Sequence, residues 1–299
     1  MSPPLPAFLL LVSIAFTSAS VAPLRPGFYA ETCPEAEFIV KDVMRRNMIR
    51  EPRSAASVMR FQFHDCFVNG CDASMLLDDT PNMLGEKLSL SNIDSLRDAV
   101  VLSGGPDWEV RLGREDSLTA SQEDADNIMP SPRANASLLI DLFERFNLSV
   151  KDMVALSGSH SIGQARCFSI VFRLYNQSGS GKPDPTIEPK YKEKLNRLCP
   201  LGGDESVTGD LDATPTIFDN RYFKDLVAGR GFLNSDQTLY TFPETKKYVT
   251  LFSKDQRAFF NAFAEGMIKM GDLQSGRPGE IRSNCRIANS RPVDALLVS

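Results

Sequence analysis

The sequence predicts a mostly helical protein of the all-α class, and three observations support this. Apolar residues recur at helical spacing in three segments: 54–67, 135–146 and 253–271. Helix boundaries are marked by Ser149 with Asp152 in a capping-box pattern, by Ser253 ahead of the last segment, and by Gly271 at its end. Strand-like alternation is confined to a short run around Trp108, which predicts at most a small hairpin.

Residues 1–22 have the pattern of a signal peptide. An apolar run from Ala7 to Phe16 is followed by small residues, although no Lys or Arg precedes the run. The run is too short to span a bilayer and no later segment reaches that length, so we expect an exported protein without a membrane partner. The domain is expected over residues 23–289, and the six cysteines of the chain suit an oxidising compartment.

The charge balance and the glycosylation triplets limit the class of partner. The formal net charge is -5 and no basic cluster stands out, so nucleic acid is not an expected partner. Three Asn-X-Ser/Thr triplets, at Asn135, Asn147 and Asn176, are typical of a secreted glycoprotein. We expect this glycoprotein to be a monomer.

One stretch, from Arg60 to Asp79, carries most of the chemistry. Arg60 and His64 are four residues apart on a predicted helix and therefore project from one face, beside Phe63 and Phe67. A histidine on an apolar helix is more often a hydrogen-bonded core residue than a catalyst. A guanidinium beside it is costly to bury without a partner, so this pairing favours a functional site over packing alone.

A turn rich in oxygen atoms follows that helix. Cys66 and Cys71 flank a turn that contains Gly70, either as a disulfide or, with His64, as three ligands of a zinc site. The secreted character of the chain favours the disulfide. The oxygen-bearing side chains around the turn suit Ca²⁺, with a solvated acidic loop as the alternative; they are Asp65, Asp72 and Ser74.

The other histidine of the chain, His160, follows a predicted helix and is flanked by Gly158 and Gly163. We expect an exposed ring directed at a nearby group, although a loop histidine without a role is the simpler interpretation. Cys167 and Cys199 bracket a Gly/Pro-rich stretch and are expected to form a second disulfide. Two histidines in such different settings suit haem chemistry, which needs an iron ligand on one side and a base that does not bind iron on the other.

Two segments resemble the signatures of the secreted plant haem peroxidases: RFQFHDCFVNGCDAS resembles the distal signature and LSGSHSIGQARC the proximal one. The resemblance continues through LGREDS, FLNSDQTLYT and GEIRSNCR and covers nearly the whole mature chain. It implies an all-α haem-peroxidase fold with a distal lobe over about 23–130, a proximal lobe over about 131–289 and haem between them. It also implies the activity, which is reduction of H₂O₂ and one-electron oxidation of small phenolic donors in the cell wall or apoplast.

The resemblance assigns roles to the two histidines and their neighbours. His160 would be the axial ligand of the iron in one haem b, and Asp236 would accept its Nδ1 proton and raise its basicity. His64 would be the distal base that moves a proton of the peroxide. Arg60 would stabilise the charge that develops as the O–O bond breaks. Asn92 would accept a hydrogen bond from His64 Nδ1 and leave Nε2 free.

Further positions would control access to the haem. Phe63 would shield its distal face, so that donors react at the haem edge near Pro130. Arg53 would pair with a haem propionate.

Two Ca²⁺ sites are also implied, each beside a histidine-bearing segment, so that ion binding is linked to activity. The distal set is Asp65, Val68, Gly70, Asp72 and Ser74, with Glu86 nearby. The proximal set lies in a turn one residue shorter than in some relatives and comprises Ser161, Asp212, Thr214, Ile217 and Asp219.

The chain departs from the family's pattern at residues 97/98. Relatives carry an additional stretch with two cysteines there, whereas SNIDSLR runs directly into DAVVLSGGPDW. Roughly thirty residues are absent, equivalent to about two average helices. Cys33 and Cys285 thereby lose their expected partners and are either free or joined to each other. The tail at 290–299 is either disordered or a vacuolar sorting signal of the kind some relatives carry.

Two functions follow from these observations. The first is an exported haem peroxidase, supported by the joint presence of Arg60, His64, Asn92, His160 and Asp236. The second is a non-catalytic, calcium-binding secreted glycoprotein that has lost haem binding through the deletion. A hydrolase is a distant third, because no Ser or Cys nucleophile is placed as a partner of His64.

Overall fold

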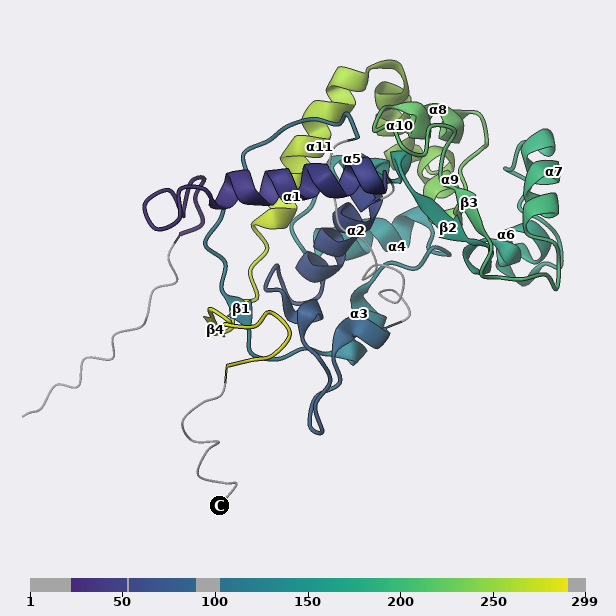
Figure 1. Cartoon of the computed structure of the whole chain (residues 1–299). Helices are drawn as coiled ribbons and strands as arrows, with labels where there is room; N and C mark the ends of the chain where they lie inside the picture. The colour runs from purple at the N-terminus through teal and green to yellow at the C-terminus, as the bar shows by residue number, and fades with distance from the viewer. Residues whose placement is uncertain (1–22, 53, 90–102, 290–299) are drawn as a thin grey trace, which may run out of the picture.

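The structure is a computed structural model that describes residues 23–52, 54–89 and 103–289 (Figure 1). The helices of this part are α1 (Ala36–Arg50), α2 (Ser54–Phe67), α3 (Gln122–Ile128), α4 (Ala136–Glu144), α5 (Val150–Ser157), α6 (Val171–Tyr175), α7 (Pro189–Leu198), α8 (Arg221–Val227), α9 (Asn234–Thr241), α10 (Pro243–Lys254) and α11 (Gln256–Gly271). The expected all-α class is therefore confirmed. Within the described ranges, no helix is both long and apolar enough to cross a bilayer.

Strands are short and come in two antiparallel pairs within the described chain. β1 (Asp116–Ser117) pairs with β4 (Gly279–Glu280), and β2 (Gln164–Arg166) pairs with β3 (Thr208–Asp210). The segment around Trp108 is a loop, as expected, and it does not form the small hairpin considered for it, because the extended chain after it pairs with a strand near the other end of the domain. A local pattern of alternation cannot reveal so distant a partner.

The predicted helix boundaries are partly confirmed. Ser149 Oγ accepts from the backbone of Asp152, and Asp152 Oδ2 accepts from the backbone of Ser149 at 2.9 Å, which is the expected capping box of α5. Helix α11 does end at Gly271, but Ser253 does not begin it. Ser253 lies inside α10, and Asp255 caps α11 by accepting from a backbone N–H in its first turn.

The largest core cluster gathers around α5 and α11, which pack against each other and against α10, while α4 packs against α5 (Figure 1). Its centre is aromatic: Phe223, Phe252, Phe259 and Phe263 are fully buried and meet mostly edge to face. Each such side chain contributes about 1.5–3 kcal/mol by burial. A smaller cluster surrounds the Cys167–Cys199 disulfide.

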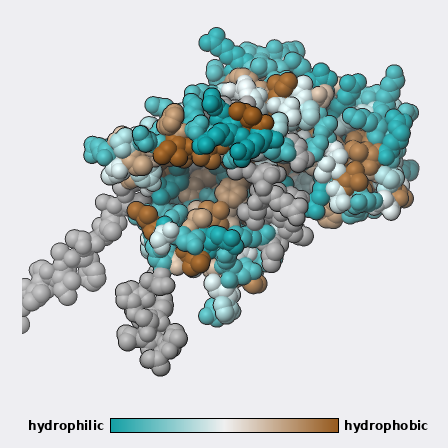
Figure 2. Space-filling model, viewed as in Figure 1, coloured by the Kyte–Doolittle hydropathy of each residue, from teal (hydrophilic) through white to brown (hydrophobic). Residues whose placement is uncertain are grey.

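Helix α1 differs from the other long helices because its apolar residues face solvent. Phe38 and Ile49 are 71% and 75% exposed, and Met48 is the residue of α1 that is buried. Figure 2 shows hydrophobic surface in the region of α1. The two remaining cysteines, Cys33 just before α1 and Cys285, are both exposed and unpaired, so of the two alternatives the structure has the free thiols.

Candidate functional site

The fold brings the two histidine-bearing segments into contact. His160 lies on a short 3-10 turn, η3 (Gly158–Ser161), which packs against α2, the helix of Arg60 and His64. Gly163 ends this segment with a φ of +101°, and a Cβ there would lie 2.8 Å from the Cβ of Ala56 on α2. Only glycine allows both the backbone conformation and this approach.

The ring of His160 is hydrogen-bonded at Nδ1, and its side chain is partly exposed to solvent. Its Nδ1 lies 2.7 Å from Oδ1 of the buried Asp236, as the resemblance implies. The second oxygen of Asp236 accepts from the backbone N–H of Leu233 at 2.9 Å, and Tyr222 also donates to Oδ1, at 3.0 Å. The His160 side chain remains 38% exposed, so Nε2 is available to a ligand that approaches from that side.

On the distal side, Arg60 Nε donates to His64 Nε2 at 3.3 Å. This bond requires a lone pair on Nε2, which is the nitrogen that a distal base would use. His64 is buried, and the ring of Phe63 meets it edge to face with centroids 5.8 Å apart. Arg60, His64 and Phe63 are therefore adjacent, as their spacing predicts.

Three other predicted positions remain predictions. Asn92 and Arg53 lie outside the described residues. Pro130 is half-buried in the connection between α3 and α4, and its place at a donor site is an inference from the resemblance.

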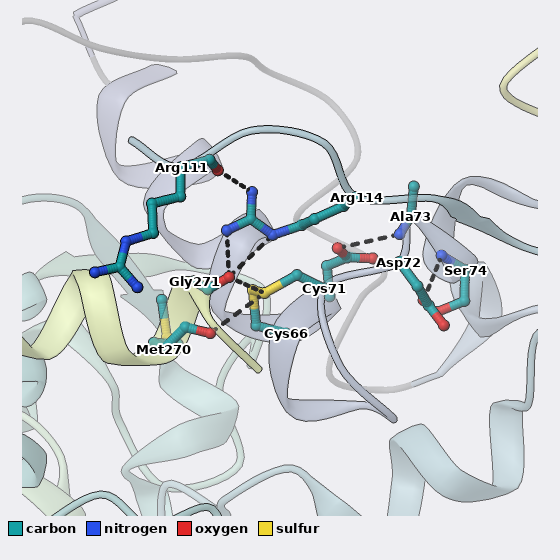
Figure 3. Close-up of a disulfide and its surroundings, with 10 residues drawn as sticks. Cys66, Cys71, Asp72, Ala73, Ser74, Arg111, Arg114, Met270 and Gly271 are labelled. Atoms are coloured by element: carbon teal, nitrogen blue, oxygen red, sulfur yellow. Dashed lines mark hydrogen bonds between the residues drawn. A yellow bond between two sulfur atoms is a disulfide. The ribbon is translucent and has the colours of Figure 1, made fainter. Parts of the chain in front are cut away.

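The turn after α2 is closed by the Cys66–Cys71 disulfide (Figure 3). The zinc interpretation is thereby wrong, because both sulfur atoms are bonded to each other. The backbone N–H of Cys71 donates to Leu273 O at 3.0 Å, and Arg114 Nε donates to Gly271 O at 2.9 Å. The first contact fastens the turn to the C-terminal end of α11, and the second holds the segment of Arg114 at the same end.

A buried arginine, Arg282, holds the same turn from the other side. Its guanidinium donates to the carbonyl oxygens of Ala73 at 3.1 Å, Ser117 at 2.7 Å and Cys285 at 2.7 Å. Sequence reasoning missed this residue, because an isolated arginine in an irregular segment gives no local signal of burial.

The distal calcium candidates lie in this turn, in the last turn of α2 and, for Glu86, in the short 3-10 turn η2 (Glu86–Leu88), and several of their carboxyl groups are buried. Asp65 Oδ2 accepts from Ala73 N at 3.2 Å, but Oδ1 is buried without a hydrogen-bond partner. Burial, and then the neighbouring Asp72, raises the pKa of Asp65 to about 7. Burial likewise raises the pKa of Glu86 to about 8, with Asp65 and Asp72 adding to it. A cation would satisfy this buried negative charge. Val68, Gly70 and Ser74 complete the buried set.

The five proximal candidates are also brought together. Ser161 Oγ lies 2.9 Å from Asp219 O, 3.3 Å from Ile217 O and 3.4 Å from Asp212 Oδ2. Thr214 Oγ1 lies 3.3 Å from Asp219 Oδ1. Burial raises the pKa of Asp212 to about 7, with Asp219 contributing. One serine proton cannot serve three acceptors, so acceptor oxygens are in excess here.

Both clusters fit a hard cation better than a transition metal. No three His, Cys, Asp or Glu side chains within the described ranges form a group that could hold a metal ion. Any ion at these turns would therefore also depend on hydroxyl and carbonyl oxygens, which are ligands typical of Ca²⁺.

Comparison with known proteins places these features in a family. The sequence model of the family described as "Peroxidase" matches residues 40–97 and 93–255. The chain is 69% identical to "Peroxidase 17" of Arabidopsis thaliana over 328 residues, covering 99% of each chain. It is 41% identical to "Peroxidase C2" of Armoracia rusticana, covering 95% of this chain and 92% of that protein.

Proposed function

Because the chain belongs to the peroxidase family, we propose that it is a secreted haem peroxidase that reduces H₂O₂ and oxidises small phenolic donors by single electrons. The observation that carries this proposal is the arrangement of the two histidines. His160 is tied to Asp236 and open on its other side, and its segment packs against the helix that presents Arg60 and His64.

The residues around His160 fit one haem b. An imidazole whose Nδ1 is bound by a buried carboxylate keeps one orientation and one tautomer, and its Nε2 is the more basic for it. Haem bound at Nε2 would supply the redox-active iron that takes up the oxidising equivalents of the peroxide.

The distal residues supply the proton chemistry. When Arg60 turns from His64 Nε2 to the peroxide, the Nε2 lone pair that it occupied accepts a proton from the peroxide, and the imidazolium then returns it to the departing oxygen. Arg60 adds a fixed positive charge beside the O–O bond, where negative charge develops. Phe63 narrows the space above the base, so that donors larger than peroxide are excluded from it. We propose that Asn92 accepts a hydrogen bond from His64 Nδ1 and so fixes the orientation of the ring.

We also propose one Ca²⁺ ion in each oxygen-rich turn and export as a glycoprotein to the cell wall or apoplast. The excess of buried acceptor oxygens supports the ions. The three glycosylation triplets support the export, because Asn135, Asn147 and Asn176 are all exposed.

We propose further that the chain lacks about thirty residues near 97/98 relative to its family. Two findings support this. The family model matches the chain in two separate segments, which overlap at residues 93–97. The alignment to the Arabidopsis protein spans 328 residues, although this chain has 299, so the alignment contains gaps in this chain. The exposed apolar residues of α1 and the unpaired Cys33 and Cys285 suit such a loss.

The test is an absorption spectrum of the secreted chain, expressed with haem and calcium, followed by a pulse of H₂O₂ and then a phenol. We expect a Soret band that shifts with peroxide and returns with the phenol. In His160→Ala, the band should no longer lie at the wavelength of histidine-bound haem. Folded protein without a Soret band would overturn the proposal in favour of the calcium-binding, non-catalytic glycoprotein.

A further inference from the structure

The carboxylate of Asp236 receives hydrogen bonds from three separate elements. His160 on η3 and Tyr222 on α8 both donate to Oδ1, at 2.7 Å and 3.0 Å, while the backbone N–H of Leu233 donates to Oδ2. Tyr222 is fully buried, at 1% exposure. The phenol and the imidazole therefore compete for the same oxygen atom.

This competition has a chemical consequence for the histidine. A carboxylate oxygen that already accepts one charge-assisted hydrogen bond attracts a second proton less strongly, because the first donor withdraws part of its charge. The less Asp236 attracts the Nδ1 proton, the less electron density reaches Nε2. A donor at Oδ1 thus weakens the electron donation of His160.

We propose that Tyr222 is a positioning residue that limits the basicity of His160 through Asp236 and so raises the reduction potential of the iron that His160 binds. This inference rests on the proposed haem function. The phenol must stay protonated to act in this way, and burial raises its pKa well above the usual range, with Asp236 adding to the effect.

The ring of Tyr222 also restrains the imidazole directly. The two rings meet edge to face, with centroids 6.1 Å apart and an interplanar angle of 82°. Tyr222 is fixed in turn by edge-to-face contact with Phe223 in the core. The hydroxyl position is therefore set by α8 and does not depend on a flexible loop.

A purely structural role for the hydroxyl is the competing explanation, because a buried O–H needs an acceptor. Such a role predicts a loss of stability and no change at His160. Tyr175 offers a matched control, since its hydroxyl donates to a backbone carbonyl, Cys199 O, at 2.9 Å in the other core cluster.

The experiment compares Tyr222→Phe with Tyr175→Phe in the full chain. In haem-free protein, we expect the Nδ1 proton of His160 to move downfield in the NMR spectrum of Tyr222→Phe alone. In haem-loaded protein, the midpoint potential should fall in Tyr222→Phe alone, so that the ratio of reduced to oxidised iron at a fixed potential drops roughly two- to tenfold. Incorporation of 3-fluorotyrosine at position 222, a stronger donor, should shift both signals in the opposite direction.

Unchanged signals in Tyr222→Phe, with both variants losing similar stability, would overturn the inference and leave Tyr222 a structural residue. Failure of the wild-type chain to bind haem would contradict the proposed function instead. The proton signal of the haem-free protein would still decide whether Tyr222 acts on His160.

Discussion

The two halves of the site hold their histidines in different ways. On the proximal side, His160 is fixed through Asp236 by groups from η3, α8 and the start of α9, and Tyr222 joins this network to the largest core cluster. On the distal side, Arg60 and His64 share one helix. The turn that follows this helix is fastened by a disulfide, by the bond from Cys71 N–H to Leu273 O and by Arg282.

The difference shows that one site can rest on two kinds of support. The proximal half is held mainly by the burial of many apolar side chains in the largest core cluster. The distal half shares this core through Ala55, Phe67 and the Cys66–Cys71 disulfide, and its turn depends in addition on a small number of charged hydrogen bonds, above all those of Arg282. Single substitutions should therefore separate the two halves.

The largest expected effect concerns the distal base. His64→Leu removes the proton carrier without adding charge, so we expect the rate of reaction with H₂O₂ to fall about 10²–10⁴-fold in stopped-flow measurements. The Soret band should stay in place, because His160 is unchanged. Gln62→Leu, on the same helix, is the control. A wild-type rate in His64→Leu would show that another group acts as the base.

The next effect tests the dependence of the distal turn on one side chain. Arg282→Met removes the guanidinium that donates to three carbonyl groups, of which Ala73 O keeps a second donor in Leu76 N–H. We expect the free energy of unfolding in urea to fall by about 2–4 kcal/mol. The Nδ1 proton of His160 should be unaffected. Arg286→Met, which removes an exposed pair with Asp78, is the control. Equal losses of unfolding free energy in both variants would contradict the conclusion that the distal turn depends on Arg282.

A third effect follows from the carboxyl groups of the calcium-free turns. The pKa values of Asp65, at about 7, and Glu86, at about 8, are raised above their unfolded values when the chain folds. Such groups stabilise the fold below the unfolded pKa, and this stability is lost as the pH rises through the folded pKa. Calcium-free protein should thus lose stability between about pH 4 and 8. The proximal turn contributes Asp212 alone in the same direction.

The measurement is urea unfolding at several pH values with a calcium chelator and with added Ca²⁺. Asp72, Arg114 and Arg282 also act on Asp65, so its neutral variant Asp65→Asn is needed to isolate its share. In Asp65→Asn, we expect the free energy of unfolding to fall less steeply as the pH rises. With Ca²⁺, which would bind the deprotonated carboxylates, the free energy of unfolding should instead rise with pH. A free energy of unfolding that does not change with pH in the absence of Ca²⁺ would contradict the raised pKa values of these carboxyl groups.

The smallest effect belongs to the proximal half. Ser149→Ala removes the side-chain cap of α5, the helix that leads to His160, and should cost about 1 kcal/mol of unfolding free energy. The peroxide rate should not change, because the core holds α5 in place. Thr250→Ala is the control, because the hydroxyl of this half-buried residue donates within α10, to Lys246 O, and caps no helix. A loss of peroxide rate in Ser149→Ala would show that the proximal half is less robust than its packing indicates.

Local patterns predicted the parts of the molecule whose cause is local. The capping box of Ser149 and Asp152 follows from side chains three residues apart, and the pairing of Arg60 with His64 follows from helical spacing. Asp236 was found through its motif, because no spacing relates it to His160.

The features that could not be predicted depend on distant contacts. In the sequence, nothing distinguishes Tyr222 from an ordinary buried aromatic residue of a helix. Its hydroxyl reaches Asp236 only because the fold packs α8 against α9. Helix α1 was not anticipated, because Phe38, Ile39 and Val40 are consecutive and do not form one apolar stripe.

The position of Arg282 near the C-terminus also sets an order of events during synthesis. Arg282 follows Ala73, whose carbonyl it holds, by 209 residues. At roughly 5–20 residues per second, the ribosome adds it about 10–40 s after the distal turn has been made. Cys66 and Cys71 are only five residues apart and can be joined within the emerging chain. The disulfide can thus keep the turn closed until the last part of the domain arrives to fasten it.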